Sequence, residues 1–477
     1  MVGYKRPEDD ILESQTIRKY PVLHNLSKAR RSIMENFIED YQNFLGKLST
    51  PMDVVDEVVR RAKLKKRGKD KKWFTFQEGF HPTQNYFIVD REGTNFAIVK
   101  YGQRGKPYVL EAGLKVLFAH TDSPCLMVKA RPERFEWDPD LKELYSGARL
   151  DTIPYGGVHP YQWLGRTVYL TGWTITKNGV KKRIKPRTGY IPDFSPHINS
   201  SARQTSTSFN EAFSMESLDV ILGNESKKSM REFFGMNCTE DWASSRIFVV
   251  PYANPRMLDN YFMTGYGHDD RACVFAAMRA LFRSKPKHTC VFFGFDKEEI
   301  GSHGISGAQG KFFENVINEL AYGEDKQYWS IKDLGYRVDR IIDRSLAISA
   351  DVDIGSTHAE IDEIDRENVA RMGYGPFIKA QDGACDDNQI SPITVRTMRN
   401  LVDGRKKIRC QFIGSPHKAD EVEGVSTMSI DFTNRRGLET VDAGIGVGSL
   451  HSPEEILNGG DLYWCAELYQ TFFESDS

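Results

Sequence analysis

Two adjacent glutamates, Glu298 and Glu299, stand where an apolar run gives way to a turn. The run, 290–293, is typical of a buried strand, and the segment FDKEEIGS (295–302) follows it. An isolated pair of acidic residues is most often part of a solvated turn. The pair gains a chemical role only if other parts of the chain bring partners to it.

A histidine and an aspartate follow a second apolar run, in KVLFAHTDSP (115–124). The strand period of two residues places His120 and Asp122 on the same face as the chain leaves the sheet. One ring nitrogen of a histidine can bind a metal ion while a nearby carboxylate fixes the tautomer through the other nitrogen. A hydrogen-bonded structural histidine is the alternative interpretation of this spacing.

Three more candidate ligands stand beside expected strands or helices. Asp269, in YGHDDRACVF (266–275), precedes an apolar helix whose N-terminus it could equally cap. Asp351 ends an apolar strand, and His451 follows a glycine-rich turn just before Pro453 and an expected helix. The aspartate of RMLDN (256–260) is a weaker candidate, because no apolar helix follows it. With the glutamates, these positions predict one crevice at the carboxyl ends of the strands of an α/β sheet.

Two imidazoles and three carboxylates form the candidate ligand set, without a thiolate: His120, Asp269, Glu299, Asp351 and His451. Such a set suits Zn²⁺, Mn²⁺ or Co²⁺, and one bridging carboxylate would build a dinuclear site with metals ~3.5–4 Å apart. Glu298 is then left beside the metals, where a carboxylate can accept a proton from an activated water. It is therefore the candidate general base of a hydrolysis reaction.

Apolar patterns elsewhere predict an α/β fold whose helices cover both faces of a sheet. Apolar residues recur at helical spacing over 27–45, which predicts a first helix. A second helix is expected after Thr50, with Pro51 at its first position. Further helices are expected at 271–283, 308–322 and 461–474, and strands at 86–90, 95–101, 115–119, 290–295, 346–350 and 408–413.

Residues 131–250 have a different character. They are rich in turns and short strand-like runs such as RTVYLTGWTIT (166–176), and the dipeptide Asn178-Gly179 is suited to a tight hairpin. The predicted organisation is a catalytic domain in two parts, 1–130 and 251–477, interrupted by an inserted β-rich domain at 131–250.

Composition excludes several classes of protein. The 477 residues can bury a full-sized core, and 64 Lys and Arg nearly balance 66 Asp and Glu, so neither a nucleic acid nor an acidic membrane surface is an expected partner. No apolar segment is long enough to span a bilayer. Seven scattered cysteines without a CxxC pair suit a reducing cytoplasm, which is the expected location.

Six segments in a fixed order resemble the aspartyl aminopeptidase or aminopeptidase I family of dinuclear metallo-exopeptidases, especially its bacterial members. They are AHTDSP, YGGVHPYQW, YGHDDRACVF, DKEEIGS, SADV and LHSPEE, and they span most of the chain after residue 85. The resemblance implies a zinc-exopeptidase-like catalytic domain, in which helices sandwich a mixed β-sheet, with an inserted β-rich dimerisation domain. It also implies dimers that assemble into dodecamers.

The resemblance further implies roles for individual residues. One metal would bind His120, Asp269 and Asp351, and the other Asp269, Glu299 and His451, with Glu298 as base and Asp122 orienting His120. Two divalent ions per subunit are implied, with Zn²⁺ favoured over Mn²⁺ or Co²⁺. By the same analogy His159 would reach a neighbouring subunit's active site, and Lys418 would contact the substrate. Local packing of His159 and a surface ion pair of Lys418 are the alternatives.

The expected activity is removal of N-terminal amino acids from peptides with a free N-terminus, through a water activated by two metals. A dinuclear amidohydrolase of acylated amino acids is one alternative, and a catalytically silent peptide-binding or scaffold protein is another. The sequence departs from the family pattern where glycines are replaced in Val422–Val425. This loop would line the substrate pocket, so the preferred N-terminal side chain stays open.

Overall fold

The structure is a computed structural model, and it describes most of the chain. The described ranges are 26–64, 85–102, 113–133, 148–195, 213–223, 230–323, 334–357, 362–380, 390–404, 408–416 and 428–476, with a few short pieces between them.

A mixed sheet of nine strands forms the centre of the larger part of the molecule. Its order is β22 (Gln411–Ile413), β21 (Phe377–Lys379), β23 (Glu439–Gly444), β19 (Leu346–Ser349), β6 (Lys115–His120), β18 (Cys290–Phe295), β5 (Phe96–Lys100), β4 (Tyr86–Val89) and β3 (Thr75–Phe76). The run from β23 through β19 and β6 to β18 is parallel, and β5 joins β18 in the antiparallel sense. Four neighbouring strands therefore end at the same edge of the sheet.

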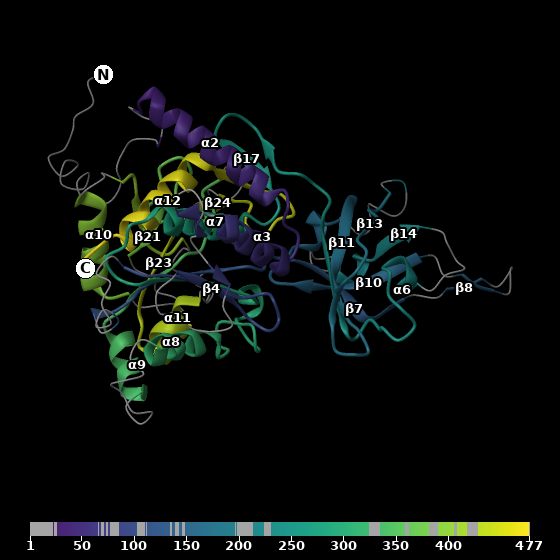
Figure 1. The fold of residues 1–477 in the computed structure, drawn as a ribbon. Coiled ribbons are helices and arrows are strands. Elements are labelled where there is room, and N and C mark those ends of the chain that lie inside the picture. Colours follow the sequence, from purple (N-terminus) through teal and green to yellow (C-terminus); the bar gives the residue numbers. More distant parts are fainter. Residues whose placement is uncertain are drawn as a thin grey trace, which may run out of the picture.

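Helices cover both faces of this sheet (Figure 1). One layer holds α2 (Lys28–Leu45), α3 (Pro51–Leu64), α7 (His268–Arg283), α10 (Pro392–Gly404) and α12 (Gly459–Phe473), and the other α8 (Phe312–Gly323), α9 (Leu334–Asp343) and α11 (Met428–Arg436). Alternate residues of β6 enter the two cores: Leu117 packs with the first layer and Phe118 with the second. The expected α/β sheet with helices on both faces is confirmed.

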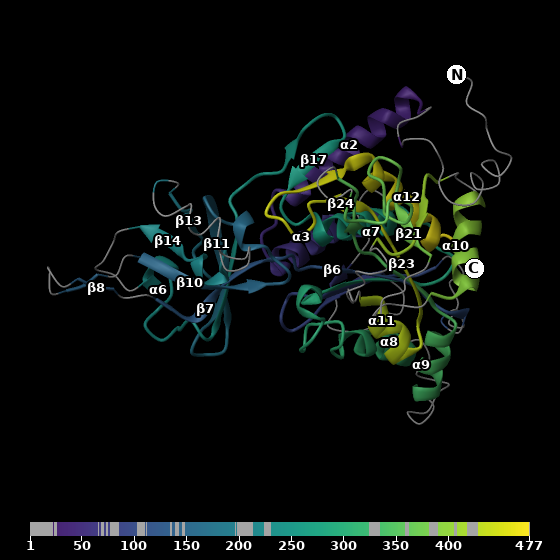
Figure 2. The same ribbon diagram turned by 180° about the vertical axis from the view of Figure 1, so that it is seen from behind.

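A second sheet, separate from the first, closes into a barrel. Its antiparallel ring runs through β7 (Cys125–Glu133), β10 (Ala148–Tyr155), β14 (Val220–Gly223), β13 (Arg187–Ile191), β11 (Arg166–Ile175) and β15 (Ser245–Pro251), which pairs again with β7. The short β12 (Lys181–Arg183) joins β11 through the expected hairpin, where Gly179 has a φ of 76°. Seen from behind, the barrel lies to one side of the helical layers (Figure 2). Closure removes the exposed strand edges that promote aggregation.

A small third sheet lies over the first helical layer. It consists of β16 (Arg256–Met257), β17 (Phe262–Gly265), β25 (Glu455–Asn458), β24 (Gly446–Gly448) and β20 (Asp353–Ile354). Two short hairpins complete the described strands: β1 (Lys66–Arg67) with β2 (Lys71–Lys72), and β8 (Glu136–Asp138) with β9 (Glu143–Tyr145).

The expected first helix is confirmed at Lys28–Leu45, where the Ser27 side chain accepts the Arg30 amide. The helix expected directly after Pro453 is wrong. Glu455–Asn458 forms a strand instead, because it pairs with β17, and α12 begins only at Gly459, where the Asn458 side chain caps it. The helix expected from residue 308 starts at Phe312.

No helix within the described ranges is both long and apolar enough to cross a lipid bilayer.

Candidate metal centre

Three neighbouring parallel strands deliver candidate residues to one edge of the central sheet. His120 is the last residue of β6 and pairs with Phe295, the last residue of β18. Glu298 and Glu299 follow β18 in a short 3₁₀ turn, which is bounded by the left-handed residues Lys297 (φ 69°) and Gly301 (φ 86°).

The remaining candidates reach the same edge from other elements. Asp351 stands two residues beyond β19. Asp269 lies at the start of α7, where Asp269 and Asp270 have non-helical backbone angles before the regular helix begins. His451 lies in the turn after β24 and has a φ of 63°.

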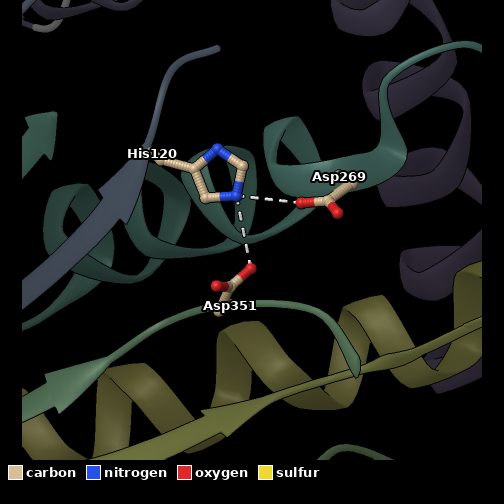
Figure 3. Close-up of side chains that lie close together, drawn as sticks. All are labelled: His120, Asp269 and Asp351. Atoms are coloured by element: carbon tan, nitrogen blue, oxygen red, sulfur yellow. Dashed lines mark ion pairs between the residues drawn. The ribbon is translucent and has the colours of Figure 1, made fainter. Parts of the chain in front are cut away.

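His120, Asp269 and Asp351 form the first group (Figure 3). The His120 Nε2 atom lies 2.9 Å from Asp269 Oδ1 and 3.4 Å from Asp351 Oδ1. The His120 side chain is 1% exposed, so this nitrogen faces the two carboxylates in an interior without bulk water.

Asp269, Glu299 and His451 form the second group. The His451 Nε2 atom lies 3.3 Å from Asp269 Oδ2 and 3.7 Å from Glu299 Oε2. Within each group the candidate ligand atoms lie within 4.8 Å of one another. The two oxygens of Asp269 therefore face different histidines, which is the arrangement that a bridging carboxylate requires.

The outer ring nitrogen of each histidine has a partner of its own. His120 Nδ1 lies 3.1 Å from the backbone oxygen of Asp122 and 3.4 Å from its Oδ1 atom. His451 Nδ1 lies 2.9 Å from the backbone oxygen of Gly157. When Nδ1 donates to these oxygens, the Nε2 lone pair is free to bind a cation.

Asp122 is fully buried and organises the turn that carries the glutamates. Its two carboxylate oxygens accept the backbone amides of Glu298 and Glu299, both at 3.2 Å. The Tyr155 hydroxyl, from the end of β10 in the barrel, donates to Asp122 Oδ2 at 3.0 Å. Asp122 therefore contacts both the first histidine and the turn.

Glu455 has a comparable place that sequence reasoning missed. Its Oε2 atom accepts the Asp269 amide at 3.2 Å, and its Oε1 atom accepts the His451 amide at 3.0 Å. Its signal in the sequence is the second glutamate of LHSPEE, four residues after His451. The pairing of β25 with β17 places Glu455 opposite Gly265, four residues before Asp269.

Burial and crowded negative charge perturb the acids of this site. Burial, with the charges of Asp351 and Asp122, raises the pKa of Glu298 to about 8, and burial raises the pKa of Asp351 to about 6. Burial and the nearby Asp269 raise the pKa of Glu299 well above its ordinary value. A site of this kind needs positive charge.

The residues present fit divalent cations. Glu299 Oε1 is buried and has no hydrogen-bond partner among the described residues. The ion pairs of Asp269, Glu299 and Asp351 within the described chain are made with His120 and His451 rather than with lysine or arginine. Imidazole and carboxylate donors without thiolate suit Zn²⁺, Mn²⁺ or Co²⁺.

The other candidates fall elsewhere. His159 is exposed on the barrel, and its ring centroid lies 5.7 Å from that of Tyr161. Asp259, the aspartate of RMLDN, is exposed in a turn and accepts the amides of Tyr261 and Phe262. Lys418 lies outside the described residues.

Helices on both faces of a mixed sheet, with imidazole and carboxylate donors where its parallel strands end, define the zinc-exopeptidase-like class of proteins. The model of the aminopeptidase I zinc metalloprotease family (M18) matches residues 44–473, and the chain belongs to this family.

Curated relatives and solved structures agree with this assignment. The chain is 28% identical over 481 residues to a probable M18 family aminopeptidase 1 of Borrelia garinii, covering 94% of this chain and 98% of the relative. It is 27% identical to the Thermotoga maritima protein of the same name, covering 93% and 97%. The chain is therefore a metal-dependent aminopeptidase.

The crystal structure of an M18 aminopeptidase from Thermotoga maritima matches with a TM-score of 0.81 at 25% identity, covering 95% of this chain and 99% of that one. The S. cerevisiae mApe1 dodecamer matches with a TM-score of 0.68 at 17% identity, covering 92% and 96%, and shows the shared fold.

Proposed function

We propose that this aminopeptidase holds two divalent ions, Zn²⁺ with Mn²⁺ or Co²⁺ as substitutes, between the two groups that share Asp269. It then uses Glu298 as general base to remove the first residue of a peptide with a free N-terminus. The observation that carries this proposal is the position of Asp269, with one carboxylate oxygen toward each histidine, at 2.9 Å and 3.3 Å.

When bound, the ions would polarise the substrate carbonyl and lower the pKa of water. Among the chain's own residues, His120 and Asp351 would hold one ion and Glu299 and His451 the other. Asp122 would keep the ring of His120 in the binding tautomer through its contact with Nδ1.

Glu298 belongs to neither group of candidate metal ligands, so its carboxylate stays available for proton transfer. Burial beside other acids raises its pKa to about 8. Bound cations would lower this pKa, so that the carboxylate can accept a proton near neutral pH and pass it to the leaving amine.

Assembly and location follow as further parts of the proposal. Residues 131–250 would form the dimerisation domain, and the dimers would build a dodecamer like that of the similar mApe1. Tyr190 and Ile221, direct cross-strand partners on β13 and β14, are both exposed on the barrel and suit such an interface.

His159 and Lys418 stay proposed substrate contacts. Free thiols at the six described cysteines support a cytoplasmic location.

The first experiment compares Asp269→Asn with Glu298→Gln. We expect Asp269→Asn to lose both ions, because it removes the shared charged ligand. Glu298→Gln should keep two ions per subunit and lose about 10²–10⁴-fold in kcat, because it removes only the base. Elemental analysis and peptide hydrolysis measure the two effects.

The matched control is Asp259→Asn, an exposed aspartate in the competing RMLDN segment. It should keep both metals and full activity. Peptides with free and acetylated N-termini are compared in the same assay. Preference for the acetylated series would favour the amidohydrolase, and a metal-loaded Glu298→Gln enzyme with normal turnover would exclude Glu298 as base.

A further inference from the structure

The barrel touches both groups of the candidate metal centre through one short segment, Tyr155-Gly156-Gly157. This segment begins with Tyr155, the last residue of β10, and only residues 121–124 separate β6 of the central sheet from β7 of the barrel. The barrel wall and the metal centre are therefore adjacent both along the chain and in space.

The ring of Tyr155 packs within the barrel, and its hydroxyl reaches the candidate metal centre. Its Cα pairs with Cys125 of β7, and its ring packs edge-on against Phe248 at 6.0 Å. The hydroxyl donates to Asp122 Oδ2 at 3.0 Å, and Asp122 in turn contacts His120 Nδ1. The residue is 7% exposed, so the hydrogen bond is shielded from water.

At Gly157, two residues after Tyr155, the backbone contacts the second group of candidate ligands, which contains His451. The Gly157 carbonyl lies 2.9 Å from His451 Nδ1, and a Cβ atom at Gly157 would come within 3.3 Å of that nitrogen. A Cβ atom at Gly156 would lie 3.1 Å from Glu299 Oε2 and 3.2 Å from Glu299 Cβ. Gly156 also has a φ of 77°, so glycine suits both the backbone and the available space.

We propose that Tyr155–Gly157 is a positioning element, through which the barrel fixes the ring orientation of both histidines. Tyr155 acts on the His120 group through Asp122, and Gly157 acts on the His451 group directly. The affinity of each metal position then depends on how the barrel sits against the central sheet. This inference rests on the proposed two-metal function.

The test measures two Co²⁺ dissociation constants by chelator competition, together with the Co²⁺ absorption spectrum, on the full-length protein. Gly156→Ala should weaken one of the two Co²⁺ positions by 10–100-fold and change its spectrum, because the added methyl displaces the segment from Glu299 and His451. Tyr155→Phe should weaken the other position by about tenfold, because it removes only the hydroxyl that holds Asp122.

Two variants in the same barrel serve as matched controls. Gly179→Ala imposes the same left-handed strain, since Gly179 has a φ of 76°, but a Cβ atom there meets nothing within 4 Å. Tyr252→Phe removes a hydroxyl from an exposed tyrosine directly after β15. Both should bind Co²⁺ like the wild type. Thermal unfolding of the metal-free variants identifies any general loss of stability.

The proposal is overturned if Gly156→Ala and Tyr155→Phe change Co²⁺ binding no more than their controls. If the wild type binds no Co²⁺, the two-metal function and the positioning role both fall. If it binds two ions and cleaves no peptide, only the peptidase mechanism falls, and the comparison of variants still decides the role of the segment.

Discussion

Asp269 is held on several sides by neighbouring residues. The Ser123 hydroxyl donates to its carbonyl oxygen at 2.6 Å, and Glu455 accepts its amide. Hydrogen bonds with His120 and His451 lower the pKa of the Asp269 carboxyl against the opposing effect of burial. The carboxylate is thus oriented by its neighbours, which would reduce the reorganisation needed to bind the proposed cations.

The stability that Glu57 on α3 contributes should depend on pH. Burial opposes its ionisation, but the hydrogen bonds that Arg60 and Arg61 donate lower the pKa of Glu57 to about 2. Because the pKa is depressed in the folded state, the stabilisation is complete above the ordinary value of 4.5 and is lost as the pH falls toward 2.

We expect Glu57→Gln to lower the free energy of unfolding by about 1–3 kcal/mol at pH 7, a range reduced for the exposure of the arginines. The difference from wild type should shrink as the pH falls below 4.5. Urea unfolding between pH 7 and pH 3.5 measures it. A difference that stays constant over this range would contradict the assignment.

At the scale of elements, the close approach of β18 to β5 supports the strand that leads to the two glutamates. Gly294 pairs with Phe96, and a Cβ atom at Gly294 would lie 2.2 Å from the Phe96 ring. Gly294→Ala should lower the free energy of unfolding by about 1–3 kcal/mol, because the ring must leave its packed position. Thermal or urea unfolding checks this value.

Gly335→Ala on α9 is the matched control, because nothing lies within 4 Å of its Cβ position. Alanine there should be neutral or add up to about 1 kcal/mol, since it favours the helix. Relief of the Gly294→Ala defect by Phe96→Leu in the double variant would identify the ring as the cause. Additive effects would point to another origin.

The strands and helices that carry the proposed ligands could be predicted because their signals are local. The apolar run before His120 and the helix after Asp270 follow periods visible in the sequence. Barrel closure and the strand at Glu455–Asn458 depend on pairing with distant segments, so local patterns could not reveal them. The contacts of Tyr155, Gly157 and Glu455 depend on the same long-range pairing, since each contacts a residue far away in the chain.

At the scale of the whole molecule, metal removal should lower thermal stability. Ions that bind the folded state alone stabilise it by about 4 kcal/mol when their concentration is a thousand times the dissociation constant. Chelated protein should therefore unfold at a lower temperature, and added Zn²⁺ should restore the original value. Differential scanning calorimetry measures the shift. Asp269→Asn should show no response to Zn²⁺, and an unchanged wild-type transition would contradict a resident metal.

The turn that follows β18 has a wider consequence, because left-handed residues at both of its ends fold it back toward the sheet edge. In the proposed function, two chemically identical side chains there have separate tasks, one as ligand and one as base, because the backbone path directs them differently. The same dipeptide grafted onto a straight strand would direct its acids to opposite faces and reproduce only half of the chemistry. A designed protein that carries this site must therefore reproduce the backbone conformation of the turn as well as the sequence of the motif.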